Sequence, residues 1–247
     1  MPLVSSEAIV LRARALGEAD QLVSFLTRDQ GRLRGVAPNA RRSQRRFGAA
    51  LQALSHVRLW FYERAHQELV RLSESDLIEA FWDARGEYER TLALSQVVEL
   101  AERLLPEREP VEKSFRLLLG TLRAFKVHDS VWLPLTYFQL WSVRLAGWLP
   151  SLERCGRCRS LLESEPAYVS PAREQLCCRK CRHPEMALLN EADRKAALEM
   201  LSQPLARLSA QGWDRQRGAE LRRYLLDVVE YHSERKLTTR ELMHEKA

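Results

Sequence analysis

The sequence predicts an α+β protein in which an N-terminal five-stranded OB-fold barrel precedes an all-α domain carrying an inserted four-cysteine zinc knuckle. Three observations support this prediction. Apolar residues alternate in short runs up to about residue 75, and beyond that point they recur at helical spacing. All five cysteines of the 247 residues lie between Cys155 and Cys181. We therefore expect a barrel domain at residues 1–75 and a helical domain at 76–247, with the insertion at about 151–187.

Short alternating runs separated by turn residues indicate the barrel. Gly31 suits a tight hairpin turn because it supplies a positive φ. A long polar loop, Pro38 to Gly48, separates the third run from the fourth. Five short strands with one long loop fit a small closed barrel such as the OB fold, with an open antiparallel sheet as the alternative. The expected strands are residues 7–14, 20–27, 32–37, 57–62 and 68–72.

From Leu77 onward the apolar residues follow the helical period, and Pro106 and Pro110 close the first helical segment. Asn190 is a suitable N-cap for the fourth helix, with Asp193 three residues later. The later helices are expected at 115–126, 135–149, 191–202 and 217–235. Aromatic residues at helical spacing around the third helix favour core packing over base stacking, and they are Trp132, Tyr137, Phe138, Trp141 and Trp148.

Positive charge is concentrated in one short stretch. The formal net charge is +6, and residues 28–46 alone hold seven arginines against one acid, Asp29. A local surplus of this kind favours a polyanionic partner such as nucleic acid. The candidate DNA-binding residues are Arg32, Arg34, Arg41, Arg42, Arg45 and Arg46. The candidate stacking residues are Phe47, Trp60 and Tyr62, of which the last two share one strand face while Phe61 points to the other.

The cysteines form two CxxC knuckles, Cys155 with Cys158 and Cys178 with Cys181. Two intervening residues let both thiolates of a knuckle face one ion, and four sulfurs complete the closed tetrahedral shell of a structural Zn²⁺ site. Cys177 could replace Cys178 as a ligand, but the shorter spacing favours Cys178. His183 is a spare ligand that four cysteines make unnecessary. We expect one structural Zn²⁺ without a catalytic role.

The sequence offers little support for an enzyme or a membrane protein. It lacks a phosphate-cradling Gly-Lys-Ser/Thr loop, its six histidines are scattered, and its acids form no two-metal cluster. Glu7 and Arg12 interrupt the apolar N-terminal stretch, which argues against a signal peptide. The most apolar long window is also too polar for a membrane span. We therefore expect a cytoplasmic binding protein.

Short motifs in a fixed order resemble the RecO family of recombination mediators. The N-terminal motifs are Gly17-Glu18-Ala19-Asp20, Leu26-Thr27, Gly31-Arg32, Val36-Ala37, Ala40-Arg41-Arg42, Gly48 and Leu51-Gln52. The C-terminal motifs are Ser170-Pro171, Leu176, Cys178, Cys181, His232, Leu237, Thr239 and Arg240. The sequence departs from the family pattern at Pro38-Asn39, at Glu174-Gln175 and at Thr238, but no departure removes a cysteine.

The resemblance implies a non-enzymatic, nucleoid-associated protein that binds single- and double-stranded DNA. It implies annealing of complementary strands, including strands coated by single-strand binding protein. It also implies action with RecR and, indirectly, with RecA, whose loading RecR and this protein would assist. The alternative is an RNA-binding protein with an OB fold and a zinc knuckle but without a strand-annealing role.

Overall fold

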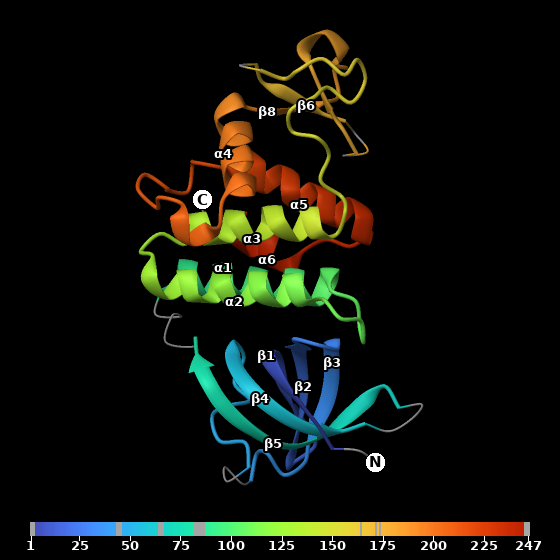
Figure 1. Cartoon of the computed structure of the whole chain (residues 1–247), viewed down its shortest axis with the longest axis vertical. Helices are drawn as coiled ribbons and strands as arrows, with labels where there is room; N and C mark the ends of the chain where they lie inside the picture. The colour runs from blue at the N-terminus through green and yellow to red at the C-terminus, as the bar shows by residue number, and fades with distance from the viewer. Residues whose placement is uncertain are drawn as a thin grey trace. The chain divides into compact units, whose positions relative to one another are not determined.

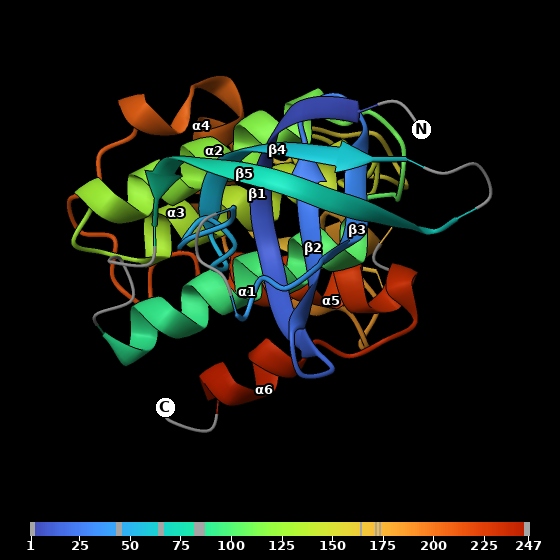
Figure 2. The ribbon, with the colours of Figure 1, turned by 90° about the horizontal axis from the view of Figure 1, so that it is seen from below.

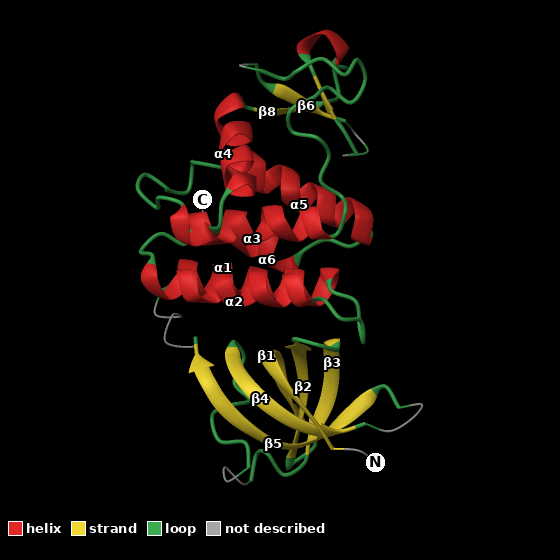
Figure 3. Cartoon of the chain, viewed as in Figure 1, coloured by secondary structure: helices red, strands yellow, loops and turns green. Residues whose placement is uncertain are grey.

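A computed structural model describes residues 3–42, 46–63, 67–81, 87–163, 165–170, 172 and 174–244 (Figure 1). The chain divides into two compact units, residues 1–126 and residues 127–247. The first unit contains the barrel and two helices, and the second contains the remaining helices and a small sheet (Figure 3). Among the helices that the structure describes, none combines the length and apolar character that a bilayer crossing requires.

Five strands close into a barrel in the order β1-β2-β3-β5-β4, which confirms the predicted OB fold and excludes the open sheet. Only the β3–β5 pair is parallel, and β4 and β5 cross the other strands steeply (Figure 2). At that pair, a Cβ on Gly35 would lie 2.8 Å from Cγ2 of Val70, so glycine permits the close approach. The strands are β1 (Leu3–Leu16), β2 (Asp20–Thr27), β3 (Gly31–Ala37), β4 (Ser55–Tyr62) and β5 (Leu69–Ala80).

Alternation along the strands fills the barrel, because successive side chains point to opposite faces. The rings of Phe25 and Phe61 lie inside, with centroids 6.0 Å apart. Other inward apolar residues come from every strand and from the loop between β3 and β4. They include Val10, Val23, Leu33, Phe47, Leu51, Leu59, Val70 and Leu72.

The prediction that helical structure begins at Leu77 is wrong, since β5 continues to Ala80. The cause is tertiary pairing: β4 supplies hydrogen-bonding partners along its whole length, ending with Ser55 opposite Ala80. Leu77 lies in this extension and is 44% exposed. Apolar residues at helical spacing therefore occur here in a strand, because the end of β5 that carries Leu77 is partly exposed to solvent.

Helices α1 (Tyr88–Leu104) and α2 (Glu112–Val127) belong to the same unit as the barrel. Arg12 on β1 pairs with Glu102 on α1 at 2.9 Å. Arg123 on α2 pairs with Glu79 on β5, also at 2.9 Å. The loop between the helices lies so close to the β2–β3 turn that a Cβ on Gly31 would clash with the backbone of Glu109. Polar contacts thus hold both helices to the barrel.

His56 on β4 is buried between the barrel and α2. It is 4% exposed, and its ring packs edge-on against Phe115. Nε2 lies 3.7 Å from Oε2 of Glu7, and neither ring nitrogen has a hydrogen-bond partner among the described residues. Burial lowers the pKa of His56, and Arg123 also lowers it, while Glu7 and Glu79 act in the opposite direction. The folded protein therefore favours the neutral imidazole.

This burial predicts acid sensitivity of the first unit. Below the unfolded-state pKa of about 6.5, His56 is protonated in the unfolded chain but stays neutral in the folded protein. The free energy of unfolding therefore falls with decreasing pH until the pKa of His56 in the folded protein is reached. The loss is up to about 1.4 kcal/mol per pH unit. Denaturant unfolding between pH 7 and 5 should show a shallower decline for His56→Phe than for the wild type. Equal slopes for both proteins would contradict the prediction.

The second unit begins with α3 (Trp132–Leu145), which starts and ends earlier than predicted. Pro134 lies in its first turn, where a missing N–H is tolerated. Gly147 takes φ +78° and ends the helix. Its N–H donates to the carbonyl of Arg144, and the N–H of Trp148 donates to the carbonyl of Val143. The predicted core role is confirmed for Trp132, Tyr137 and Phe138, which are buried, whereas Trp141 and Trp148 are partly exposed.

A small antiparallel sheet with strand order β7-β6-β8 forms the framework of the cysteine-bearing insertion. Its strands are β6 (Ala167–Val169), β7 (Leu176–Cys177) and β8 (Ala187–Leu189), and β8 leads directly into α4 (Glu191–Ser202). The predicted N-cap of α4 is confirmed, since the side chain of Asn190 accepts a hydrogen bond from Asp193 N at 2.7 Å.

Two residues in the first turn of α4 form hydrogen bonds with other segments of the second unit. The Asp193 carboxylate accepts hydrogen bonds from the backbone N–H groups of Gly218 and Leu221, both at 3.0 Å. These N–H groups begin α5 (Ala219–Ser233), so Asp193 caps that helix. Arg194 is 2% exposed and donates to three carbonyl groups of the insertion, those of Leu152, Glu163 and Glu165.

The chain ends with α6 (Thr238–His244), a helix that the sequence analysis did not predict. Glu234 takes φ +53° and separates it from α5. Arg240 then bonds Asp227 at 2.8 Å and Glu230 at 2.7 Å, which ties α6 back onto α5. His232, at the end of α5, stacks on Trp148 with centroids 4.6 Å apart. The tail motif found in the sequence therefore closes the second unit.

Candidate metal centre and nucleic-acid interface

The structure brings four cysteines together as the spacing predicts. The sulfur atoms of Cys155, Cys158, Cys178 and Cys181 all lie within 4.8 Å of one another. Two thiolates at about 2.3 Å from a tetrahedral Zn²⁺ are about 3.8 Å apart. The Cys158 and Cys178 sulfurs are 3.7 Å apart. The cluster therefore fits one tetrahedral ion, and its four sulfur donors suit a soft or borderline metal.

Backbone hydrogen bonds shape the first knuckle and join it to β7. Cys155 N donates to Ser160 O, and Arg159 N donates to Cys155 O, both at 2.9 Å. Gly156 N donates to Leu176 O at 2.7 Å. A Cβ on Gly156 would lie 2.4 Å from Oε1 of Gln175, so the bare glycine backbone is what allows the two segments to meet.

The second knuckle is a short 3₁₀ turn, η2 (Arg179–Cys181), in which Cys181 N donates to Cys178 O at 3.0 Å. Cys177 pairs with Tyr168 on β6, and its buried side chain is not among the four clustered sulfurs. Burial raises the pKa of Cys177, and the neighbouring Cys155 raises it further. His183 contacts Arg157 at 3.0 Å and is not part of the four-cysteine group.

The backbone around Cys155 favours its thiolate. Burial raises the pKa of Cys155, but hydrogen bonds from the backbone N–H groups of Cys158, Cys178 and Arg157 outweigh burial and lower the pKa to about 6. In contrast, the hydrogen bond with Cys158 and further burial raise the pKa of Cys181 to about 12. Thiolates at this separation repel one another, so full ionisation of the cluster requires a cation.

The loop after β3 carries the predicted arginines and is anchored at both ends. Arg41 donates to the carbonyls of Gly17 and Glu18 in the β1–β2 turn, and exposed Arg42 pairs with Glu18 at 3.0 Å. Arg46 donates to Pro38 O at 2.6 Å, and its own carbonyl accepts from Ser75 N on β5. Arg45 lies outside the described residues. Arg41, Arg42 and Arg46 are thus anchored by neighbouring backbone and side-chain groups.

Arg32 and Arg34 have partners in the loop between α1 and α2. Arg32 donates to Leu105 O at 3.2 Å and pairs with Glu107 at 3.0 Å, and its side chain is 17% exposed. Arg34 pairs with Glu107 and Glu68, both at 3.4 Å. These two arginines therefore connect the loop between α1 and α2 to the barrel, whereas Arg41 and Arg42 contact the β1–β2 turn.

The candidate stacking residues Phe47, Trp60 and Tyr62 differ in how far they are buried. Phe61 is fully buried in the barrel, and Phe47 is 2% exposed with the Arg46 guanidinium 5.3 Å from its ring. Trp60 and Tyr62 lie on the outer face and are half-buried. Only these last two rings are therefore available to contact a nucleobase.

The strand register also defines an outer row of side chains that the sequence analysis missed. Tyr62 pairs with Arg71 across β4 and β5, and Arg71 pairs with Val36 on β3. Val36 pairs with Leu22 on β2, and Leu22 pairs with Arg14 on β1. Arg14 and Arg71 are exposed, and the other three are half-buried. This outer row crosses all five strands with two cations, one aromatic ring and no acid.

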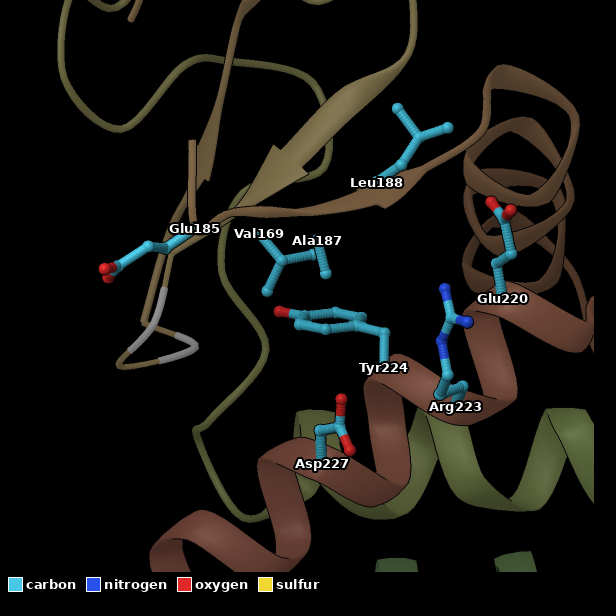
Figure 4. A pocket seen from close by; sticks show the side chains of 8 residues that line it. All are labelled: Val169, Glu185, Ala187, Leu188, Glu220, Arg223, Tyr224 and Asp227. Carbon is cyan, nitrogen blue, oxygen red and sulfur yellow. The ribbon is translucent and has the colours of Figure 1, made fainter. Parts of the chain in front are cut away.

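A small pocket of about 50 Å³ lies between β8 and α5 (Figure 4). Two of its three acids already have structural partners: Glu220 accepts two hydrogen bonds from Asn190, and Asp227 pairs with Arg240. This volume holds a water molecule or two but no nucleotide. The pocket is therefore not a candidate for the main binding site.

Comparisons with known proteins cover both units. The model of "Recombination protein O N terminal" matches residues 1–81, and that of "Recombination protein O C terminal" matches residues 85–241. The DNA repair protein RecO of Koribacter versatilis is 44% identical over 237 residues, which are 96% of this chain and 96% of that protein. The DNA repair protein RecO of Pelotomaculum thermopropionicum is 33% identical over 241 residues, 96% of this chain and 92% of that protein.

Proposed function

This chain belongs to the RecO family of DNA repair proteins, and we propose that it is a recombination mediator that binds single- and double-stranded DNA. On this proposal it anneals complementary strands. Together with RecR, it assists the loading of RecA onto strands coated by single-strand binding protein. It acts by binding, without a catalytic step, in the cytoplasm and in association with the nucleoid.

The observation that carries the proposal is a group of exposed arginines on the barrel, Arg14, Arg41, Arg42 and Arg71. Arg41 and Arg42 lie against the β1–β2 turn, a few residues beyond Arg14 at one end of the outer row. A positively charged track beside Tyr62 and Trp60 has the two components of a single-strand binding surface, which are phosphate contacts and stacking platforms. The exposed Arg42–Glu18 pair contributes little stability, so phosphate can replace the carboxylate.

Phosphate contacts carry no base information, so this surface binds strands of any sequence with similar affinity. Binding releases counterions and is therefore strongly salt-dependent. The same contacts are available on a duplex backbone, whereas stacking on Tyr62 and Trp60 requires unpaired bases. A surface of this kind can hold a single strand before pairing and the duplex after pairing, as an annealing protein requires.

We further propose that the four-cysteine cluster holds one Zn²⁺. When bound, zinc supplies a closed tetrahedral link between the two knuckles and leaves no open position for a substrate. Its role is structural: Cys155 and Cys158 on one turn are tied to Cys178 and Cys181 on the other. Elemental analysis of the purified protein should show about one equivalent of zinc per chain.

The loop arginines provide the test of DNA binding. If all four residues contact phosphate, replacing Arg41, Arg42, Arg45 and Arg46 with alanine should lower the affinity for a mixed-sequence single strand by about 100-fold at 0.15 M salt. The slope of log affinity against log salt should flatten by about 0.7 per lost contact. Fluorescence anisotropy over a salt series measures both quantities. Annealing should fall in parallel with binding.

A matched control removes exposed cations from elements other than the barrel strands and their loops. Lys113 and Arg116 on α2 and Arg207 in the second unit are exposed, and their alanine variant should bind DNA as the wild type does. Unchanged affinity and salt slope in the loop variant would remove the loop from the proposal. Competition with a matched RNA strand tests the alternative function, because clear preference for RNA would favour an RNA-binding protein.

A further inference from the structure

We propose that the two cysteine knuckles form a second phosphate-binding surface, centred on Arg159, Arg179 and Lys180, that holds the second strand during annealing. This inference rests on the proposed function, and it assigns part of that function to the second unit. It extends the DNA-binding surface from the barrel, where the sequence concentrates its net charge, to the turns around the cysteine cluster.

Charge counting shows that these turns hold more cations than the metal site requires. Residues 154–160 and 177–183 contain six lysines and arginines and no aspartate or glutamate. Four thiolates around the proposed Zn²⁺ carry a net charge of −2, so the two turns keep a surplus of four positive charges. The acids nearest in the sequence, which are Glu153, Glu174 and Glu185, lie outside both turns.

Three of the six cations are engaged within the knuckles. Arg154 donates to Arg159 O at 3.3 Å, and Arg157 contacts His183 at 3.0 Å. Arg182 donates to the hydroxyl group of Tyr168 at 3.2 Å, and its guanidinium lies 5.3 Å from the centre of that ring. These contacts fix the shape of the two turns. The other three cations of the two turns are Arg159, Arg179 and Lys180.

Arg159, Arg179 and Lys180 are exposed, and none of them forms an ion pair within the part of the chain that the structure describes. Arg159 directly follows Cys158, and Arg179 directly follows Cys178, whose sulfurs are 3.7 Å apart. The cysteine cluster therefore brings the turns that carry Arg159 and Arg179 together, although these residues are 20 positions apart in the sequence, and Lys180 follows Arg179.

The backbone conformation at Arg159 is unusual for an arginine. Arg159 takes φ +65°, a left-handed conformation that asparagine or glycine adopts more easily than arginine. An arginine at this strained position has no ion-pairing role in the described structure, so its charge points to an external partner. The phosphate backbone of a DNA strand is a partner that suits these cations, which form no ion pair among the described residues.

The test uses full-length, zinc-loaded protein carrying Arg159→Asn, Arg179→Ala and Lys180→Ala. Asparagine is chosen at 159 because it tolerates a positive φ. Titration with a labelled single strand too short to reach both surfaces should show two strands bound by the wild type and one by the variant. The rate of annealing of complementary strands should fall at least tenfold, while the affinity of the remaining barrel site stays within about twofold. The control is the variant at Lys113, Arg116 and Arg207.

The outcomes separate this inference from the proposed function. If the wild type bound no DNA, the proposed function would fail. If the wild type bound and annealed DNA and the knuckle variant matched it in stoichiometry and rate, only this inference would be overturned. A wild type that binds a single short strand would overturn it equally, as would a patch that binds an acidic protein but no oligonucleotide. Metal analysis at one equivalent confirms that the variant keeps its site.

Discussion

Removal of the metal from the cysteine cluster is expected to unfold residues 151–187 while the barrel stays folded. The sheet of this insertion has strands of only three, two and three residues, so the proposed sulfur–metal bonds should contribute much of its stability. Structural zinc contributes about 10–16 kcal/mol to the folding of small zinc-finger peptides. Hydrogen exchange after chelation should rise first in the insertion. A uniform rise over both units would contradict this local picture.

Ligand variants sharpen this expectation, because the chain offers a neighbouring cysteine as a matched control. Cys178→Ser removes one of the four clustered sulfurs and should lower the zinc content well below one equivalent per chain. Cys177→Ser changes a buried thiol outside the four-cysteine group and should leave the zinc content near one. The reverse order would show that Cys177 is the ligand, although the site itself would stand.

Replacement of Arg194 with methionine should be the most destabilising single change in the second unit outside the metal site. Methionine fills similar space but cannot donate to the carbonyl groups of Leu152, Glu163 and Glu165. The bond to Leu152 is buried and those to Glu163 and Glu165 are partly buried. Because a buried carbonyl that loses its partner costs about 1–3 kcal/mol, the free energy of unfolding should fall by about 3 kcal/mol. The thermal midpoint of the second unit should fall by about 6–12 °C.

Lys195→Met, one residue further along the same helix, is the control for Arg194→Met. The Lys195 side chain is 61% exposed and pairs with Glu191 on the surface of α4, so its loss should cost under about 1 kcal/mol. Calorimetry and denaturant unfolding measure both variants. If the two destabilised the protein equally, the carbonyl network of Arg194 would not carry the stability assigned to it.

Local chemistry made the strands and the cysteine cluster predictable. Along β3, inward and outward residues alternate strictly, so Leu33 and Arg34 could be assigned to opposite faces before any pairing was known. The CxxC spacing likewise fixes which sulfurs can meet, and Cys178 lies in the cluster as the spacing favours. The N-cap at Asn190 is similarly local, since it depends only on the next three residues.

The features that escaped prediction depend on partners distant in the sequence. The intramolecular partner of Arg32 could not be predicted, because Arg32 donates to a carbonyl 73 residues further along the chain. Leu77 reads as helical until β4 provides its strand partner. The outer row from Arg14 to Tyr62 exists only through the register of four strand pairings. Arg194 shows no sequence signal, because its acceptors are backbone carbonyl groups.

The parallel pairing of β3 with β5 has a consequence for how the protein folds during synthesis. Gly35 meets Val70 only after the long loop and β4 have been made, so the barrel cannot close while the ribosome is still adding its first 70 residues. Until then the hairpin of β2 and β3 carries an unpaired edge, which is open to aggregation. Loop closure over this distance also makes barrel formation slow compared with the helices that follow. Barrel closure is therefore expected to limit the folding rate of the first unit.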